Sequence, residues 1–267
     1  MSPLVNRIVI GVPLAVGMLA ALWVGGTALA IVGIVFALLG LDELYRMGRR
    51  YRPIVIAGHA GGLGIVAGAH WGGIEWMLLP IPLTLLVTFL LTAMVAGRES
   101  ATVSIALTLL GPCWIALGIG FLILLRNVGP DDDYGLNLVL ATLLGVWASD
   151  IFAYAGGRAY GRRKLAPAIS PGKTVEGFLT GLVLGTAVVW FTLYGQGVGQ
   201  GAALVVGVVV CLASPLGDLF ESFLKRDLGV KDSGRTLGAH GGVLDRIDAL
   251  LFAGPAAWIT LDLLGAL

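Results

Sequence analysis

Acidic residues recur near the end of this chain, at the borders of two apolar runs, although only 12% of all residues are charged. Asp218 lies near the end of one run, and Asp245 and Asp248 stand one helical turn apart at the start of the next. If the two runs form consecutive helices, their hairpin brings Asp218 and Asp245 together. Two carboxylates among lysines and arginines suit a hard cation such as Mg²⁺ better than zinc. This combination is typical of phosphoryl or nucleotidyl transfer from a nucleoside triphosphate.

Polar residues form a stripe along the run that contains Asp218. Their spacing puts them on one side of a helix whose other positions are mostly apolar. They are Ser214, Asp218, Glu221, Ser222 and Lys225. A solvated face would not begin inside an apolar run, so the stripe predicts part of a site.

A glycine-rich, basic loop over residues 227–242 separates the two runs. Glycines such as Gly241 and Gly242 let backbone amides approach a ligand closely. Basic side chains in and around the loop can supply positive charge for phosphates. They are Lys225, Arg226, Lys231, Arg235, His240 and Arg246.

Asp150 lies near the end of another long apolar run. It precedes Tyr154 by one turn and Arg158 by two, so one helical face becomes polar there. An ionisable group inside a membrane span is costly and is a functional candidate by default. A structural ion pair between Asp150 and Arg158 is the alternative.

The sequence SPGKTVEG, which begins at Ser170, resembles a nucleotide-binding P-loop. It lacks the first glycine of that motif, because Pro167 occupies the position, and no strand precedes it. We expect a helix here instead, with Ser170 as its N-cap and Pro171 at its first position. The amides at such a helix start, together with Lys173, can hold a phosphate, and Glu176 lies on the same side. A simple topology anchor is the alternative role for Lys173.

The elements that carry these residues must be membrane-spanning helices. Hydrophobic residues make up 57% of the 267 residues, more than in a soluble domain, and the apolar runs are long and unbroken. We predict an all-α, polytopic integral membrane protein with about nine spans. The expected spans are 8–24, 26–45, 54–71, 77–96, 102–125, 136–156, 174–195, 201–222 and 245–265. Within one span, close contact with a neighbouring helix is predicted by the regularly spaced Gly177, Gly181 and Gly185.

Positive charge predicts the orientation of the chain. With a cytoplasmic N-terminus, all but one of the 17 lysines and arginines fall on the cytoplasmic side, and the exception is Arg126. The polar residues then form a cleft that faces the cytosol. This basic face suits anionic lipid head groups or a phosphorylated substrate, and no nucleic acid is expected. The N-terminus also resembles a signal peptide, but its apolar character continues to Leu41, which favours two retained helices.

The two halves of the chain differ in chemical content. Residues 1–135, with about five spans, are chemically quiet and are expected to form a scaffold that faces lipid or a second chain. Residues 136–267, with about four spans, are expected to form the catalytic membrane domain, with cytoplasmic loops at 157–173 and 223–244. In the first half, Asp42 and Glu43 stand beside Arg46, and a local helix-end ion pair explains them about as well as a site.

At the polar positions of the second half, the sequence resembles the phosphatidate cytidylyltransferases, also called CDP-diacylglycerol synthases. The signature of that family contains a serine, lysine-arginine, lysine-aspartate and a closing H-G-G-x-x-D-R-x-D. Its residues stand here at matching spacing, as Ser222, Lys225, Arg226, Lys231, Asp232, His240, Gly241, Gly242, Asp245, Arg246 and Asp248. Two further blocks, SDIFAYAGGRAYGRRKLAPAISPGKTVEG and SPLGDLFESFLKR, also look like the family, so the resemblance covers roughly residues 142–266.

The resemblance implies transfer of the cytidylyl group of CTP to phosphatidic acid in the inner leaflet, which gives CDP-diacylglycerol and pyrophosphate for phospholipid biosynthesis. It implies Mg²⁺ held by Asp218 and Asp245, with a second cation such as K⁺ possible, and a homodimer in the inner, cytoplasmic membrane. The other residues expected to act in catalysis are Lys173, Lys225, Arg226 and Arg246. The residues expected to bind CTP or phosphatidate are Asp150, Ser170, Lys173, Glu176, Ser214, Glu221, Ser222, Lys231, Asp232, Arg235, His240, Gly241, Gly242 and Asp248.

Two other functions fit part of the pattern. A CTP-dependent lipid-alcohol kinase, of the dolichol or phytol kinase kind, would release CDP instead of pyrophosphate. An ion-coupled transporter could use Asp150 and Asp218 as part of an ion path. Transporters usually bind at the midplane between repeated halves, whereas the polar residues here lie at one membrane face of the second half.

Overall fold

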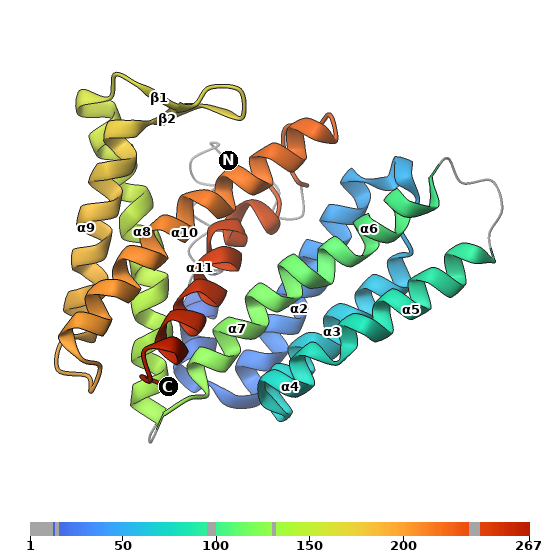
Figure 1. Cartoon of the computed structure of the whole chain (residues 1–267), viewed down its shortest axis with the longest axis horizontal. Helices are drawn as coiled ribbons and strands as arrows, with labels where there is room; N and C mark the ends of the chain where they lie inside the picture. Colours follow the sequence, from blue (N-terminus) through green and yellow to red (C-terminus); the bar gives the residue numbers. More distant parts are fainter. Residues whose placement is uncertain (1–12, 14–15, 95–99, 130–131, 235–240) are drawn as a thin grey trace. The chain divides into compact units, whose positions relative to one another are not determined.

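The computed structural model describes residues 13, 16–94, 100–129, 132–234 and 241–267. The described chain is mostly helical and divides into two compact units, each built from two segments of the sequence (Figure 1). Unit 1 consists of residues 1–124 and 228–247, and unit 2 consists of residues 125–227 and 248–267.

Unit 1 contains a group of helices packed around α3. Its elements are α2 (Gly26–Met47), a 3-10 turn (Arg49–Tyr51), α3 (Val55–Trp71), α4 (Gly73–Leu78), α5 (Pro80–Ala93), α6 (Ala101–Gly111), a π-helical turn (Pro112–Ala116) and most of α7 (Leu117–Arg126). Glycines let α3 approach its neighbours closely, because a side chain at Gly61 would meet Thr84 of α5 and one at Gly62 would meet Leu41 of α2. The Tyr45 hydroxyl of α2 donates to the Thr108 carbonyl of α6 at 2.7 Å, which ties these helices together.

Unit 2 is built from long helices and a small hairpin. Its elements are α8 (Asp132–Tyr160), β1 (Lys164–Ala166), β2 (Ser170–Thr174), α9 (Val175–Leu193), α10 (Gln200–Asp227) and most of α11 (Leu244–Leu263). Helices α8, α9 and α10 pack against one another. The glycine stripe of α9 faces α8, since side chains at Gly177 and Gly181 would meet the backbone of Ala153 and Ser149. The predicted close helix contact is therefore confirmed.

Most helices are apolar and long enough to cross a membrane. In the described part of the chain, six segments meet that criterion: Gly26–Met47, Gly73–Ala93, Ala101–Arg126, Asp133–Tyr160, Val175–Leu193 and Gln200–Asp227. Apolar side chains on α9 are also exposed, including Val183 at 64% and Phe191 at 70%, as expected for contact with lipid. The chain is a multi-pass membrane protein.

The count of about nine spans stays a prediction. Helix α3, with 17 residues, is short for a span. Helix α11 begins with charged residues. The first expected span, 8–24, falls largely outside the described residues.

The expected helix start at Ser170 is wrong. Residues Ser170–Thr174 form β2, which pairs antiparallel with β1, and α9 begins only at Val175. Thr174 is the N-cap instead: its backbone is extended, and its side-chain oxygen accepts from the Gly177 amide at 3.2 Å. The structure therefore adds a two-stranded hairpin to a mainly α-helical chain.

Candidate functional site

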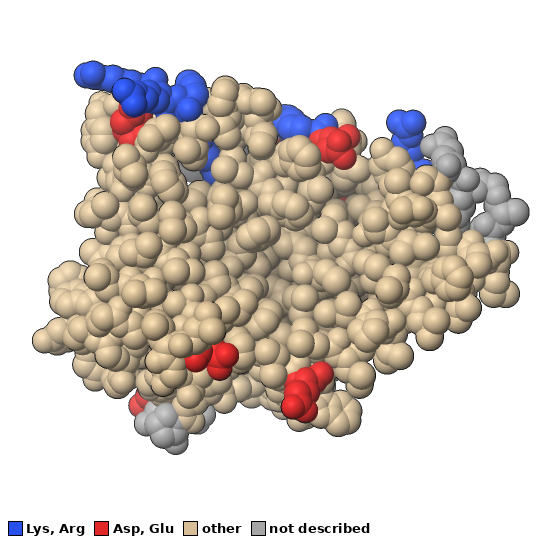
Figure 2. Space-filling model, viewed as in Figure 1, with Lys and Arg blue, Asp and Glu red and all other residues tan. Residues whose placement is uncertain are grey.

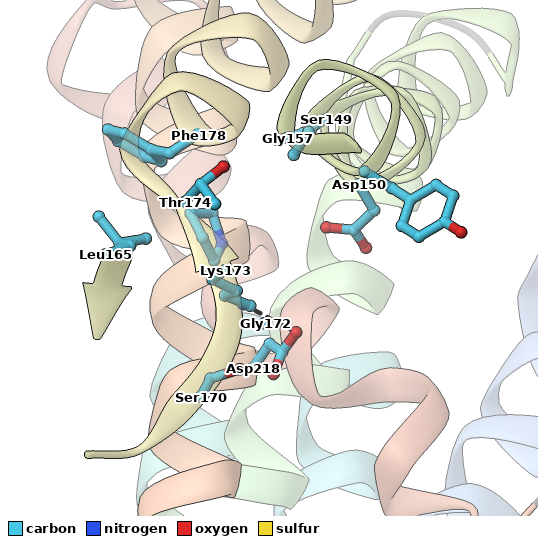
Figure 3. Close-up of a pocket in the computed structure, with 13 residues that line it drawn as sticks. Ser149, Asp150, Gly157, Leu165, Ser170, Gly172, Lys173, Thr174, Phe178 and Asp218 are labelled. Carbon is cyan, nitrogen blue, oxygen red and sulfur yellow. Dashed lines mark ion pairs between the residues drawn. The ribbon is translucent and has the colours of Figure 1, made fainter. Parts of the chain in front are cut away.

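A cavity of about 470 Å³ opens in unit 2 beside the hairpin (Figure 3). Its walls come from the last turns of α8, from the hairpin, from the first turn of α9 and from the middle of α10. Four lining residues were expected to belong to the site: Asp150, Ser170, Lys173 and Asp218. The other lining residues are Ser149, Ala153, Tyr154, Gly157, Leu165, Gly172, Thr174, Phe178 and Pro215.

An ion pair between β2 and α10 crosses this cavity. Lys173 Nζ lies 2.8 Å from Asp218 Oδ2, and the two side chains are 24% and 40% exposed. The Ser222 hydroxyl, one turn further along α10, donates to Asp218 Oδ1 at 3.3 Å. Because both charged groups remain accessible, a ligand can compete for either partner of the pair.

Asp150 of α8 faces the same pair. Its carboxylate points toward Lys173 and Asp218 (Figure 3) and interacts electrostatically with both. The hydroxyl of Ser214, which is fully buried, donates to Asp150 Oδ1 at 3.4 Å and so orients it. Within the described part of the chain, the ion pairs do not join Asp150 to Arg158, whose guanidinium donates to the Tyr154 hydroxyl at 3.3 Å.

The pairing of the hairpin is irregular around Lys173. The paired residues are Lys164 with Thr174 and Ala166 with Ser170, so β2 holds more residues between its pairs than β1 does. Such bulges bend a strand and redirect its side chains, and they recur beside active sites. Here the bulge contains Lys173, which it directs from the hairpin to Asp218.

Glu176 has a structural partner. Its carboxylate accepts from the backbone amides of Arg162 at 2.9 Å and Arg163 at 3.1 Å, which fixes the chain between α8 and β1. Exposed basic residues gather over this end of unit 2, at the upper left of Figure 2. They are Arg158, Arg162, Arg163 and Lys164, which together form a positive surface. Because its charge is opposite to that of a phosphate, this surface can attract phosphorylated ligands toward the cavity.

A second group of charges connects α10 to α11 within unit 2. Lys225 Nζ lies 2.8 Å from Glu221 Oε2, and both side chains are largely buried. Asp248 is also buried and interacts electrostatically with Asp218 and Lys225. The helices meet at Gly217, where the backbone of Asp248 leaves no room for a side chain.

Asp245 lies in unit 1, with the loop that precedes α11. Its Oδ2 atom accepts from the Ser233 hydroxyl and from the Gly242 amide, each at 2.9 Å. Because Asp218 belongs to the other unit, the expected convergence of Asp218 and Asp245 stays a prediction.

Other expected residues are exposed on their segments: Arg226, Lys231, Asp232 and Arg246. Two more lie outside the described residues: Arg235 and His240.

Sequence reasoning missed several residues at these sites. Thr174 and Tyr154 line the cavity, and their positions in the sequence could have indicated this. Thr174 follows Lys173 directly, and Tyr154 follows Asp150 by one helical turn. Glu43 was missed for another reason. Asp42 does pair with Arg46 at 2.7 Å, as a helix-end ion pair, but Glu43 instead accepts from the amides of Val243 and Leu244.

The acidic residues of unit 2 fit a hard divalent cation. Asp218 interacts electrostatically with both Asp150 and Asp248, and all three side chains offer only oxygen atoms. Among the residues that the structure describes, no three His, Cys, Asp or Glu side chains lie close enough together to hold a metal ion by themselves. Mg²⁺ is usually held by one or two carboxylates, with water and substrate phosphates completing its coordination, so the residues present suit it better than they suit zinc.

Comparison with known proteins gives a consistent result. The model of the cytidylyltransferase family matches residues 5–264. A phosphatidate cytidylyltransferase of Staphylococcus saprophyticus is 32% identical over 246 residues, which cover 89% of this chain and 91% of that protein. One from Staphylococcus haemolyticus is 32% identical over 252 residues, covering 91% of this chain and 93% of that protein. One from Mycobacterium bovis is 41% identical over 166 residues, which cover 62% of this chain and 51% of that protein. This chain belongs to the cytidylyltransferase family.

Proposed function

We propose that the chain transfers the cytidylyl group of CTP to phosphatidic acid and so forms CDP-diacylglycerol and pyrophosphate. The match of the cytidylyltransferase family to residues 5–264 carries this proposal. The arrangement of Lys173, Asp150 and Asp218 around one cavity of a membrane protein supports it. A phosphate-bearing lipid and a nucleotide both need positive charge at a membrane surface, which the hairpin end of unit 2 provides.

In this reaction, an anionic oxygen of the phosphatidate phosphate attacks the α-phosphorus of CTP. A new P–O bond forms there while the bond to the β-phosphate oxygen breaks, and pyrophosphate leaves with the electron pair. Because the nucleophile is already ionised near neutral pH, the protein has little general-base work to do. Catalysis therefore rests on alignment of the two phosphates and on neutralisation of their charge.

Lys173 is placed to take part directly. When a phosphate enters the cavity, the Lys173 ammonium can leave Asp218 and bind the new anion instead. The carboxylates of Asp150 and Asp218 then remain beside the phosphates. We propose Asp218 and Asp245 as the residues that hold Mg²⁺, which when bound would neutralise phosphate charge. Asp248, on α11, contributes negative charge beside Asp218, and Lys225, near the end of α10, interacts with Asp248 and pairs with Glu221.

The membrane supplies the second substrate. We propose that the hairpin end of unit 2 faces the cytoplasm and that the cavity also opens to the inner leaflet of the cytoplasmic membrane, so that phosphatidate enters sideways. The exposed Arg158, Arg162, Arg163 and Lys164 at the hairpin end of α8 agree with the positive-inside rule in that orientation. A cysteine at exposed Tyr154, which lines the cavity, tests this. Protection from a water-soluble thiol reagent by CTP but never by phosphatidate would argue against sideways entry.

One assay tests the activity itself. The purified protein in detergent is given phosphatidate, Mg²⁺ and each of four nucleoside triphosphates in turn. We expect pyrophosphate and CDP-diacylglycerol with CTP. A parallel reaction with a lipid alcohol in place of phosphatidate tests the kinase alternative. Release of CDP together with a phosphorylated lipid alcohol would identify a kinase, and no CTP turnover in either reaction would leave a transporter as the alternative. The proposed homodimer is tested separately, by the mass of the protein in detergent.

A further inference from the structure

Glu43 of α2 is a buried carboxylate outside the cavity described above. Its side chain is 1% exposed. Oε1 accepts from the Val243 amide at 2.9 Å, and Oε2 accepts from the Leu244 amide at 2.9 Å. These two amides belong to the start of α11, and all three residues lie within unit 1. Glu43 therefore binds the N-terminal end of a helix that is distant in the sequence.

The same carboxylate also reaches Asp245 through a serine. The Ser233 hydroxyl lies 3.2 Å from Glu43 Oε2 and 2.9 Å from Asp245 Oδ2. The Gly242 amide donates to Asp245 Oδ2 at 2.9 Å. A hydroxyl group has a single proton, so Ser233 shares it between two carboxylates. The orientation of Asp245 is thus coupled to the position of Glu43.

The glycines of the loop allow this close approach. A side chain at Gly242 would clash with the Ser233 hydroxyl and with Glu43 Oε2, and one at Gly234 would meet Glu43 Oε1. Gly241 has φ +83°, a backbone conformation that favours glycine. At Gly234 and Gly242, the absence of a side chain therefore lets the backbone of the loop approach the Glu43 carboxylate.

The energetics favour a fixed arrangement. A buried carboxylate is costly unless it is compensated, and here the positive end of a helix and two amide donors compensate it. Loss of the acceptor would leave the amides of Val243 and Leu244 without these bonds inside the protein. Each buried amide left without an acceptor then carries an uncompensated desolvation cost.

We propose that Glu43 is a positioning residue that holds Ser233 and the first turn of α11 in place, so that Asp245 presents its carboxylate to Mg²⁺ and the nucleotide. This inference rests on the proposed function for the role of Asp245. The anchoring itself follows from contacts within unit 1. The first half of the chain thereby contributes to catalysis through a residue that touches neither substrate.

Three variants separate anchoring from general stability. Glu43→Gln keeps the size of the side chain but turns an amide donor toward backbone amides. Glu43→Asp keeps the charge on a shorter side chain. Ser233→Ala removes only the bridge to Asp245. Asp42→Asn, at the adjacent exposed residue of α2, is the matched control.

The first measurement is hydrogen–deuterium exchange of the full-length protein in detergent, without metal or nucleotide. We expect Glu43→Gln to speed exchange of the amides in peptides that cover residues 241–247, and Asp42→Asn to leave it unchanged. Wild-type protection in Glu43→Gln would overturn the anchoring. This result does not depend on any catalytic activity.

The second measurement is the Mg²⁺ concentration that gives half-maximal CTP turnover. We expect it to rise by about tenfold or more in Glu43→Gln and Ser233→Ala, the range seen when a residue that orients a metal ligand is replaced. For Glu43→Asp, the Mg²⁺ concentration that gives half-maximal turnover should lie between the values for Glu43→Gln and the wild type. An unchanged Mg²⁺ requirement in Glu43→Gln, with activity reduced only in proportion to folded protein, would make Glu43 purely structural and overturn the inference. If the wild type itself shows no CTP turnover, the proposed function fails, and the exchange experiment still decides the anchoring.

Discussion

Asp218 and Glu43 are both acidic residues on long helices, but their partners differ in kind. Asp218, in unit 2, meets the flexible side chain of Lys173 at 2.8 Å beside a cavity and is 40% exposed. Glu43, in unit 1, is 1% exposed and accepts from backbone amides. A lysine can turn away when a phosphate or cation arrives, whereas the amides at a helix start stay in place. The first arrangement permits exchange of partners during a reaction, and the second fixes the backbone.

The largest effect on turnover is expected when the charge of Asp218 is removed. We expect Asp218→Asn to abolish turnover, because the amide keeps the volume of the side chain but cannot hold Lys173 or a metal ion in the same way. Asp245→Asn is expected to do the same. Pyrophosphate release measures the effect, and a size-exclusion profile in detergent checks folding. Asp227→Asn, at the exposed end of α10, is the control and should remain active. Near-normal turnover by Asp218→Asn would show that this carboxylate is dispensable.

Removal of the flexible partner should have the next largest effect. We expect Lys173→Ala to lower kcat/KM for CTP by about a hundredfold or more, the scale for loss of one positioned charge-stabilising group. Lys164→Ala is the comparison variant: Lys164 is an exposed lysine of the same hairpin that does not line the cavity, so the loss of one charge from the positive surface should lower kcat/KM far less. If both variants had similar activity, Lys173 would be a topology anchor with no part in the chemistry.

A smaller effect is expected where the hairpin joins α9. Thr174→Ala removes the N-cap of α9 and should cost about 1 kcal/mol of stability. For a protein of this size, that corresponds to a fall of about 2–4 °C in Tm, measured by thermal unfolding in detergent. Thr192→Ala is a suitable control, because the Thr192 hydroxyl donates to the Val188 carbonyl one turn earlier within α9 and caps no helix end. An unchanged Tm in Thr174→Ala would mean that the hairpin, and not the cap, fixes the start of the helix.

The smallest effect is expected at Asp42, the neighbour of Glu43. Its ion pair with Arg46 is an exposed pair one turn apart on α2. Such pairs contribute about 0.5 kcal/mol or less, so Asp42→Asn should leave both Tm and turnover unchanged. A marked loss of activity there would erase the distinction between the two adjacent carboxylates.

The sequence predicted much of unit 2 from periodicity. The glycine stripe of α9 and the polar faces of α8 and α10 follow a helical repeat, and the structure places Asp150, Lys173 and Asp218 on one cavity. The hairpin was not predictable in this way. Ser170 and Pro171 have the residue types of a helix start, whereas β2 depends on pairing with β1, a contact that local residue preferences do not reveal.

Glu43 was unpredictable for a similar reason. Its backbone partners lie 200 and 201 positions further along the chain, and no local pattern relates them. Next to it, Asp42 and Arg46 form a local ion pair, which accounts for charges at this helix end without any distant partner. Burial of one of two adjacent acids is decided by tertiary packing.

The bulge in the hairpin has a consequence for how this protein can evolve. Substitutions in the turn at residues 167–169 change side chains that do not set the strand pairing. Insertion or deletion of one residue between Ser170 and Thr174 would alter the pairing and turn Lys173 toward the opposite face of the hairpin. Related chains are therefore expected to vary in composition at this turn while they keep the length of the hairpin constant.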